Sequence, residues 1–231
     1  MVWLVRKDWV LAKRPVFVPN SAGPGFVEEV GIEFMWHAGL AVSQIRKSIA
    51  SLHAAAKAKG IAPCLEISSK SPDALGVSLS AFNLKLERPG KRPMSVECAF
   101  QGSKVFEGGG PFTDLYDRPS RDAKTDDRLH NSGALVGFRF LGEEFPLLPV
   151  TAFYDWLYLS ALNENPGPAE DLRRYAGFTD IVFNPAKSLN CQARSAALYA
   201  AACKSGRLAK MLEARRCYLD VIGAATEDAV E

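Results

Sequence analysis

Apolar and polar residues alternate in two segments near the N-terminus, residues 13–18 and 26–36, on either side of the turn-forming stretch PNSAGPG. Alternation with a period of two is typical of half-buried strands, so we predict an antiparallel pair here. Residues 40–59 instead repeat apolar side chains at helical spacing and stop at Gly60, which predicts an amphipathic helix.

The rest of the chain divides into shorter elements. The pattern predicts strands at 63–67 and 82–86, a central helix from Ser95 to the glycine triplet 108–110, a hairpin at 134–148, and helices at 149–162, 169–175, 189–203 and 207–218. Residues 114–132 are dense in charge and predict a mobile surface loop. We therefore expect an α+β fold: one helix-rich domain over residues 1–231 with a small antiparallel sheet, in which residues 1–12 and 222–231 are peripheral or frayed.

Three polar residues fall on one stripe of the otherwise apolar central helix. Glu97, Gln101 and Lys104 stand at i, i+4 and i+7, and Ser95 is suited to be the helix N-cap. An isolated buried charge is costly, so these side chains must face a solvated cleft or pair with one another. A pair between Glu97 and Lys104 on an exposed rim remains the alternative.

The composition of the chain limits the kinds of protein that it can be. The 231 residues are 48% apolar, and 28 basic against 26 acidic residues leave a net charge of +2, so any contact with a polyanion must be local. Five scattered cysteines and three histidines lack ligand spacing, and we expect no metal site. Charges interrupt the N-terminal apolar residues where a signal peptide would stay apolar, and we expect a cytoplasmic protein.

Two segments have the composition of anion sites. Lys70 lies among three serines at residues 68–71, which suits a phosphate, although polar loops also simply turn the chain. Ser188, preceded by Lys187, is the predicted cap of the helix at 189–203, with Asn190 and Arg194 in its first turns. His53, next to Leu52 on the first helix, is better explained as a hydrogen-bonded histidine at the edge of the core than as a catalytic one.

Several of these motifs together resemble the NADAR family, whose fold is called YbiA-like. The central S-V-E-C-A-F-Q-G-S-K-V-F follows L-S-A-F-N-L and precedes D-I-V-F-N and S-L-N-C-Q-A-R, and the resemblance covers about residues 65–205. The residues that match family positions are Ser80, Phe82, Glu97, Gln101, Lys104, Asp180, Phe183 and Asn190. The N-terminal extension and the longer middle resemble the branch that accompanies DarT-type DNA ADP-ribosylating toxins as an antitoxin.

The resemblance implies a hydrolase without a cofactor that removes ADP-ribose from the amino group of guanine in nucleic acid. Glu97 and Asp180 would be its two carboxylates. Lys104 would either donate a hydrogen bond to the substrate or form a Schiff base with ring-opened ribose, and we favour the donor role because Glu97 favours a protonated amine.

The same resemblance and the anion sites suggest the substrate contacts. Lys70, Ser188 and Arg194 would hold the pyrophosphate, and Phe82 or Trp156 would stack on a base, although Trp156 is closer to Asp180 than the family spacing requires. Two other functions stay open: an N-glycosidase acting on a small ribosylated metabolite, such as a pyrimidine of riboflavin metabolism, or a non-catalytic module that binds ADP-ribose or the toxin.

Overall fold

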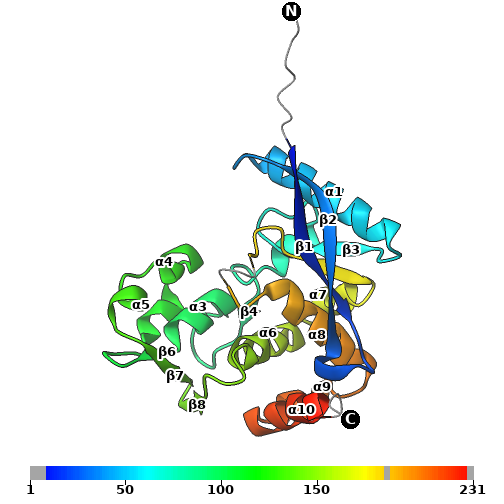
Figure 1. The fold of residues 1–231 in the computed structure, drawn as a ribbon. Helices are drawn as coiled ribbons and strands as arrows, with labels where there is room; N and C mark the ends of the chain where they lie inside the picture. The colour runs from blue at the N-terminus through cyan, green and yellow to red at the C-terminus, as the bar shows by residue number, and fades with distance from the viewer. Residues whose placement is uncertain (1–8, 185–187, 228–231) are drawn as a thin grey trace, which may run out of the picture.

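Strands and helices are mixed in the computed structural model, which describes residues 9–184 and 188–227 (Figure 1). The largest sheet has four strands in the order β2-β1-β9-β3. Its strands are β2 (Val27–His37), β1 (Trp9–Pro19), β9 (Gly177–Thr179) and β3 (Cys64–Glu66). The architecture confirms the expected α+β class with small sheets.

A long hairpin, β1 and β2, dominates this sheet. The two strands pair antiparallel from Trp9↔His37 to Pro19↔Val27 around the 3₁₀ turn η1 (Pro24–Phe26), as the alternating pattern predicts. Helix α1 (Val42–Ala58) packs on β2, and a small core forms between the helix and the hairpin from Val16, Ile32, Phe34, Ile49, Leu52 and Ala56. Its apolar stripe therefore faces the sheet, as the helical spacing indicates.

Two buried helices form the centre of the molecule. Helices α6 (Ala152–Glu164) and α8 (Gln192–Lys204) pack on one another, and the fully buried Tyr158 donates a hydrogen bond of 2.6 Å to the carbonyl of Leu79. The helices around them are α2 (Ala74–Ser78), α7 (Pro166–Leu172), α9 (Leu208–Glu213) and α10 (Arg215–Glu227). The single helix predicted at 207–218 is therefore two helices, divided at Ala214.

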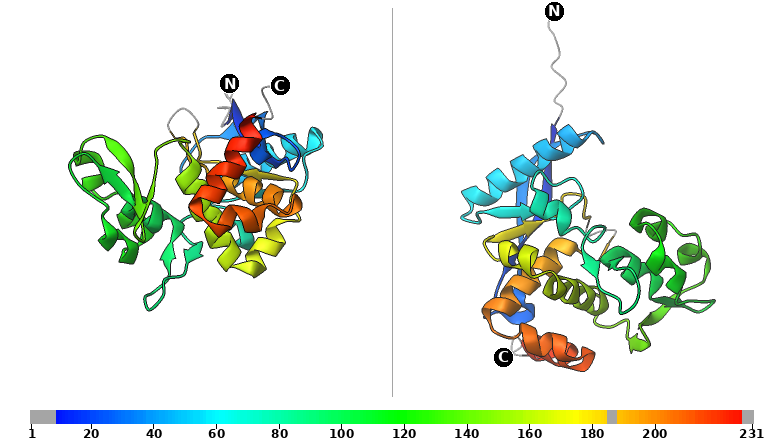
Figure 2. Two further views of the ribbon diagram at one scale, coloured as in Figure 1. Left: turned by 90° about the horizontal axis from the view of Figure 1, so that it is seen from below. Right: turned by 180° about the vertical axis from the view of Figure 1, so that it is seen from behind.

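A second group of elements, which we call the small lobe, stands to one side of these helices (Figure 2). It contains α3 (Val96–Gly102), η2 (Thr113–Asp117), α4 (Ser120–Lys124), α5 (Arg128–Asn131) and the sheet β6 (Lys104–Phe106), β7 (Leu135–Phe140) and β8 (Glu143–Phe145). The short pair β4 (Lys85–Leu86) and β5 (Met94–Ser95) leads into α3. The predicted hairpin at 134–148 is confirmed as β7 and β8.

The central helix is shorter than the sequence predicts. Ser95 is its N-cap, accepting a hydrogen bond from the Cys98 N–H at 3.1 Å, but the helix ends at Gly102 rather than at the glycine triplet. Lys104 then starts β6, which pairs with β7 opposite Phe138. Strand pairing with a distant segment thus replaces the last predicted turns of the helix.

Residues 114–132 are ordered helical turns, not the surface loop that their charge predicts. Leu115, Tyr116 and Ala123 are buried in the main core, so the charged residues occupy the outer faces of η2, α4 and α5. This correction matters because α4 presents Lys124 to the candidate site.

Both ends of the described chain are in regular structure. Residues 9–12 pair with β2, and residues 222–227 continue α10. The peripheral stretches predicted at 1–12 and 222–231 thus include two ordered segments. No helix within residues 9–184 and 188–227 has the length and apolarity to cross a membrane.

Candidate functional site

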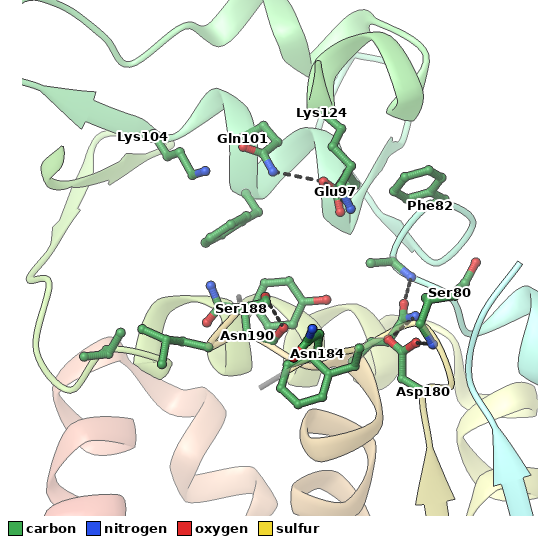
Figure 3. Close-up of a pocket in the computed structure, with 18 of the residues that line it drawn as sticks. Ser80, Phe82, Glu97, Gln101, Lys104, Lys124, Asp180, Asn184, Ser188 and Asn190 are labelled. Atoms are coloured by element: carbon green, nitrogen blue, oxygen red, sulfur yellow. Dashed lines mark hydrogen bonds and ion pairs between the residues drawn. The ribbon is translucent and has the colours of Figure 1, made fainter. Parts of the chain in front are cut away.

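A cavity of about 900 Å³ lies between the small lobe and the end of the main sheet. In Figure 3, Glu97, Gln101, Lys104 and Lys124 come from one wall, and Ser80, Asp180 and Asn190 lie across from them. Nine of the twelve residues proposed from the sequence line it: Ser80, Phe82, Glu97, Gln101, Lys104, Asp180, Phe183, Ser188 and Asn190. The geometry therefore supports the prediction that Glu97, Gln101 and Lys104 face a solvated cleft.

Glu97 and Gln101 form a buried pair on α3. Their side chains are one helical turn apart, and Gln101 Nε2 donates to Glu97 Oε1 at 2.9 Å. Lys124 Nζ lies 3.9 Å from the same carboxylate oxygen. Both residues of the pair are less than a tenth exposed, so the carboxylate is fixed in one orientation at the pocket wall.

Lys104 reaches the pocket from strand β6, with its Nζ 4.8 Å from the centre of the Phe100 ring. Burial lowers the pKa of its amine below the ordinary value; Glu97 opposes this shift and Lys124 adds to it. Glu97 thus favours the protonated amine, as expected, but desolvation outweighs this attraction.

Asp180 follows β9 directly. Strand β9 runs parallel to β3, so the ends of both strands bring Asp180 and Ser68 to the same edge of the sheet, and both line the pocket. The sequence indicates only that Asp180 lies on a loop or one turn. Burial raises the pKa of its carboxyl, while a hydrogen bond from Gln192 lowers it in part.

Gln192, which the sequence analysis did not select, fixes Asp180 in place. Its Nε2 donates to Asp180 Oδ2 at 2.9 Å and to the Ile67 carbonyl at 2.6 Å, while its Oε1 accepts from the Ala81 N–H at 2.8 Å. One side chain thus joins three segments of the pocket wall. Only its place at the first turn of the helix was visible in the sequence.

A buried network lies beneath Asp180. Glu66 is 1% exposed and accepts hydrogen bonds from the Thr179 hydroxyl at 2.6 Å and the Ile181 N–H at 2.9 Å. Burial, and then the charge of Asp180, raises the pKa of Glu66. His53 Nε2 lies 2.9 Å from the Thr179 hydroxyl oxygen, which confirms the prediction of a hydrogen-bonded histidine at the edge of the core.

Two buried acceptors face the pocket without a partner among the described residues. They are Gln101 Oε1 and Asn190 Oδ1. A buried acceptor left unpaired costs about 1–3 kcal/mol, so a ligand that brings hydrogen-bond donors to both atoms would regain that free energy. Amino and hydroxyl groups of a nucleoside have this character.

Lys124 is the cation that the sequence analysis missed. Its Nζ lies 5.2 Å from the centre of the Phe82 ring as well as near Glu97, and its side chain is 56% exposed. Together with Lys104 it gives the wall two amines, which suit a diphosphate. In the sequence, the apolar residues Leu115 and Ala123 indicate that residues 114–132 pack against the core.

Three proposed substrate contacts lie outside the pocket lining. Arg194 pairs with the buried Asp155 at 2.6 Å on α6, and Trp156 packs against Phe145 with ring centres 5.0 Å apart. Lys70 is in the turn after Ser68, whose hydroxyl accepts its N–H at 3.2 Å. These three residues therefore do not line the pocket.

The predicted anion site at the start of α8 also changes. The helix begins at Gln192 with Cys191 as N-cap, and the Ser188 hydroxyl donates to the Asn190 carbonyl at 3.2 Å instead of capping. Ser188 and Asn190 thus reach the pocket from the loop before the helix. Lys187 lies outside the described residues. Within the described chain, no cluster of three or more His, Cys, Asp or Glu side chains is arranged to hold a metal ion.

Comparison with known proteins adds one finding. A family model described as "DarT1-associated NADAR antitoxin" matches residues 12–231. No curated protein matches the chain with significant similarity.

Proposed function

Because the chain belongs to the family of DarT1-associated NADAR antitoxins, we propose that it hydrolyses the bond between ADP-ribose and the amino group of guanine in nucleic acid. It would thereby reverse the modification made by a cognate DarT-type toxin, its functional partner. Family membership supports the antitoxin role. The reaction is the one that the resemblance implies, and the residues of the site support it.

The main support is the buried Glu97 carboxylate at the wall of a cavity large enough for a dinucleotide-sized ligand. Its volume of about 900 Å³ is at the upper end of ordinary ligand pockets. Gln101 orients the carboxylate, and Lys104 and Lys124 supply positive charge for a pyrophosphate. Phe82 offers an aromatic surface beside Lys124.

The proposed reaction breaks the bond between the ribose anomeric carbon and the guanine amino nitrogen. Positive charge develops on the ribose as this bond breaks, and a carboxylate stabilises it. Glu97 would activate the water whose hydroxyl joins the anomeric carbon, and a proton would pass to the departing nitrogen. The raised pKa of Asp180 makes this second carboxyl the proposed proton donor.

In a second proposed route, Lys104 acts as a nucleophile. The lowered pKa raises the share of neutral, nucleophilic amine at any given pH. It would attack the anomeric carbon of ring-opened ribose, release the guanine amine and form an imine, which water then hydrolyses to free the lysine. The alternative role, a charged donor to the substrate, involves no covalent bond.

The decisive experiment compares three substrates under one set of conditions: an ADP-ribosylated guanine oligonucleotide, ADP-ribosyl guanosine and a ribosylated pyrimidine. We expect release of ADP-ribose from the first two and its loss in Glu97→Gln. Glu143→Gln on the exposed β8 is the matched control. Turnover of the pyrimidine alone would favour the metabolite N-glycosidase, and binding of ADP-ribose without turnover would favour a binding module.

A further inference from the structure

A second cavity, of about 390 Å³, lies on the small lobe and shares no residue with the first. Arg139 lines it, whereas the preceding residue Phe138 lines the main pocket. Consecutive side chains of a strand point to opposite faces, so Arg139 points away from the main pocket that Phe138 lines.

The cationic side chains of this second cavity come from two separate segments. Arg88 and Lys91 belong to the turn between β4 and β5, and Arg139 belongs to β7. The Arg88 side chain is 4% exposed, and its Nε donates to the Arg92 carbonyl at 2.8 Å while its terminal nitrogen pairs with Asp117. These contacts hold its guanidinium in a fixed position, so it is organised before any ligand arrives.

The carboxylates bonded to these arginines lie toward solvent. Asp117 is 61% exposed and Glu144, which Arg139 contacts at 2.8 Å, is 72% exposed. The pair of Arg139 with Glu144 is exposed on both sides, and such pairs contribute little free energy. A phosphate that enters the cavity can therefore compete for the Arg139 guanidinium, which binds phosphate through paired N–H donors, beside the fixed charge of Arg88.

The remaining walls suit a sugar next to that phosphate. Pro89, Pro111 and Leu141 supply apolar surface, and Tyr116, a residue that is 6% exposed, also lines the cavity. Small apolar walls beside cationic groups match the alternation of sugar and phosphate along a nucleic-acid chain.

We propose that this second cavity binds the phosphodiester backbone of the nucleic-acid strand whose modified base occupies the main pocket. The inference rests on the proposed function for the identity of the strand. Because the two cavities share no lining residue, only a substrate several nucleotides long contacts both.

The test uses Lys91→Gln combined with Arg139→Gln, because both residues are exposed whereas Arg88 is buried and paired. The control is Lys47→Gln combined with Lys57→Gln, which removes the same charge from exposed positions of α1. Fluorescence anisotropy with an unmodified single-stranded oligonucleotide, over a series of salt concentrations, measures binding. Turnover of ADP-ribosylated oligonucleotide and of ADP-ribosyl guanosine is measured in parallel.

We expect the Lys91/Arg139 variant to bind the oligonucleotide about tenfold more weakly, with a salt slope smaller by about 1.4 because two phosphate contacts are lost. Its KM for the ADP-ribosylated oligonucleotide should rise by a similar factor, while its turnover of ADP-ribosyl guanosine stays unchanged. The control variant should match the wild type in both binding and turnover.

Equal oligonucleotide binding by the two variants would overturn the proposal. So would loss of toxin neutralisation in cells without loss of oligonucleotide binding, because the cavity would then be a protein-binding surface. Failure of the wild type to cleave either substrate would refute the proposed function alone, since the anisotropy measurement would still test the second cavity.

Discussion

Replacing His53 by Gln tests the electrostatics of the network beneath Asp180. Thr179 donates its one hydroxyl hydrogen to Glu66, so His53 Nε2 must carry the proton of its contact with Thr179. A glutamine amide can donate the same hydrogen bond but cannot titrate. Burial lowers the pKa of His53 from 6.5 to about 4.

The sign of the effect follows from proton linkage. The unfolded chain takes up the His53 proton more readily than the folded chain, so the stability contributed by neutral His53 is complete above pH 6.5 and is lost as the pH falls toward 4. At about pH 5 the unfolded imidazole is nearly all charged and the folded one is mostly neutral, which costs wild-type protein about 2 kcal/mol relative to about pH 8.

Urea unfolding of wild type and His53→Gln at these two pH values measures the difference. We expect the wild type to lose about 2 kcal/mol more free energy of unfolding than the variant between the two conditions. Carboxylates that titrate between the two pH values affect both proteins equally, so their contribution cancels when the two losses are compared. His130→Gln, at an exposed position of α5, controls for loss of an imidazole. Equal losses for wild type and His53→Gln would show that burial does not suppress protonation of His53.

Three further predictions address the site and its support. Lys104→Met should lower kcat/KM by about 10²–10⁴. Borohydride should trap an adduct between the wild-type protein and the substrate only if the Lys104 amine forms an imine. Lys104→Arg should retain activity if Lys104 contributes only its positive charge. Gln192→Met removes the hydrogen bond that lowers the pKa of Asp180, so the limb of the pH–kcat/KM profile that reports Asp180 should move to higher pH. Gly76→Ala places a Cβ 1.9 Å from a backbone oxygen and should destabilise by about 1–3 kcal/mol in urea, unlike Gly167→Ala, whose Cβ meets open space.

Local patterns sufficed for some elements of the fold. The alternation in the first hairpin, the stripe of α1 and the cap at Ser95 each depend on residues close in sequence, and all three are present. Strand β9 could not be predicted in this way. It has three residues, and it exists through parallel pairing with β3, more than a hundred positions earlier.

The end of α3 shows the same limit within the site. A Cβ at Gly102 would lie 2.6 Å from the Tyr116 ring, so this glycine permits close packing, and the Ser103 hydroxyl donates to the Ala99 carbonyl at 2.7 Å as the helix ends. Tyr116 belongs to a segment whose charge suggests a loop. The sequence could therefore place Glu97 and Gln101 on one face, but not the strand that carries Lys104 or the helix that carries Lys124.

Gln192 also has a consequence for how the protein matures. It joins Ile67 and Ala81 to a helix that the ribosome makes more than a hundred residues later. A nascent or prematurely terminated chain that stops before this residue would contain Glu97 but lack the brace that positions the opposing acid. Such a chain would also lack α8, whose buried face is part of the main core, so we expect neither a stable fold nor activity from it.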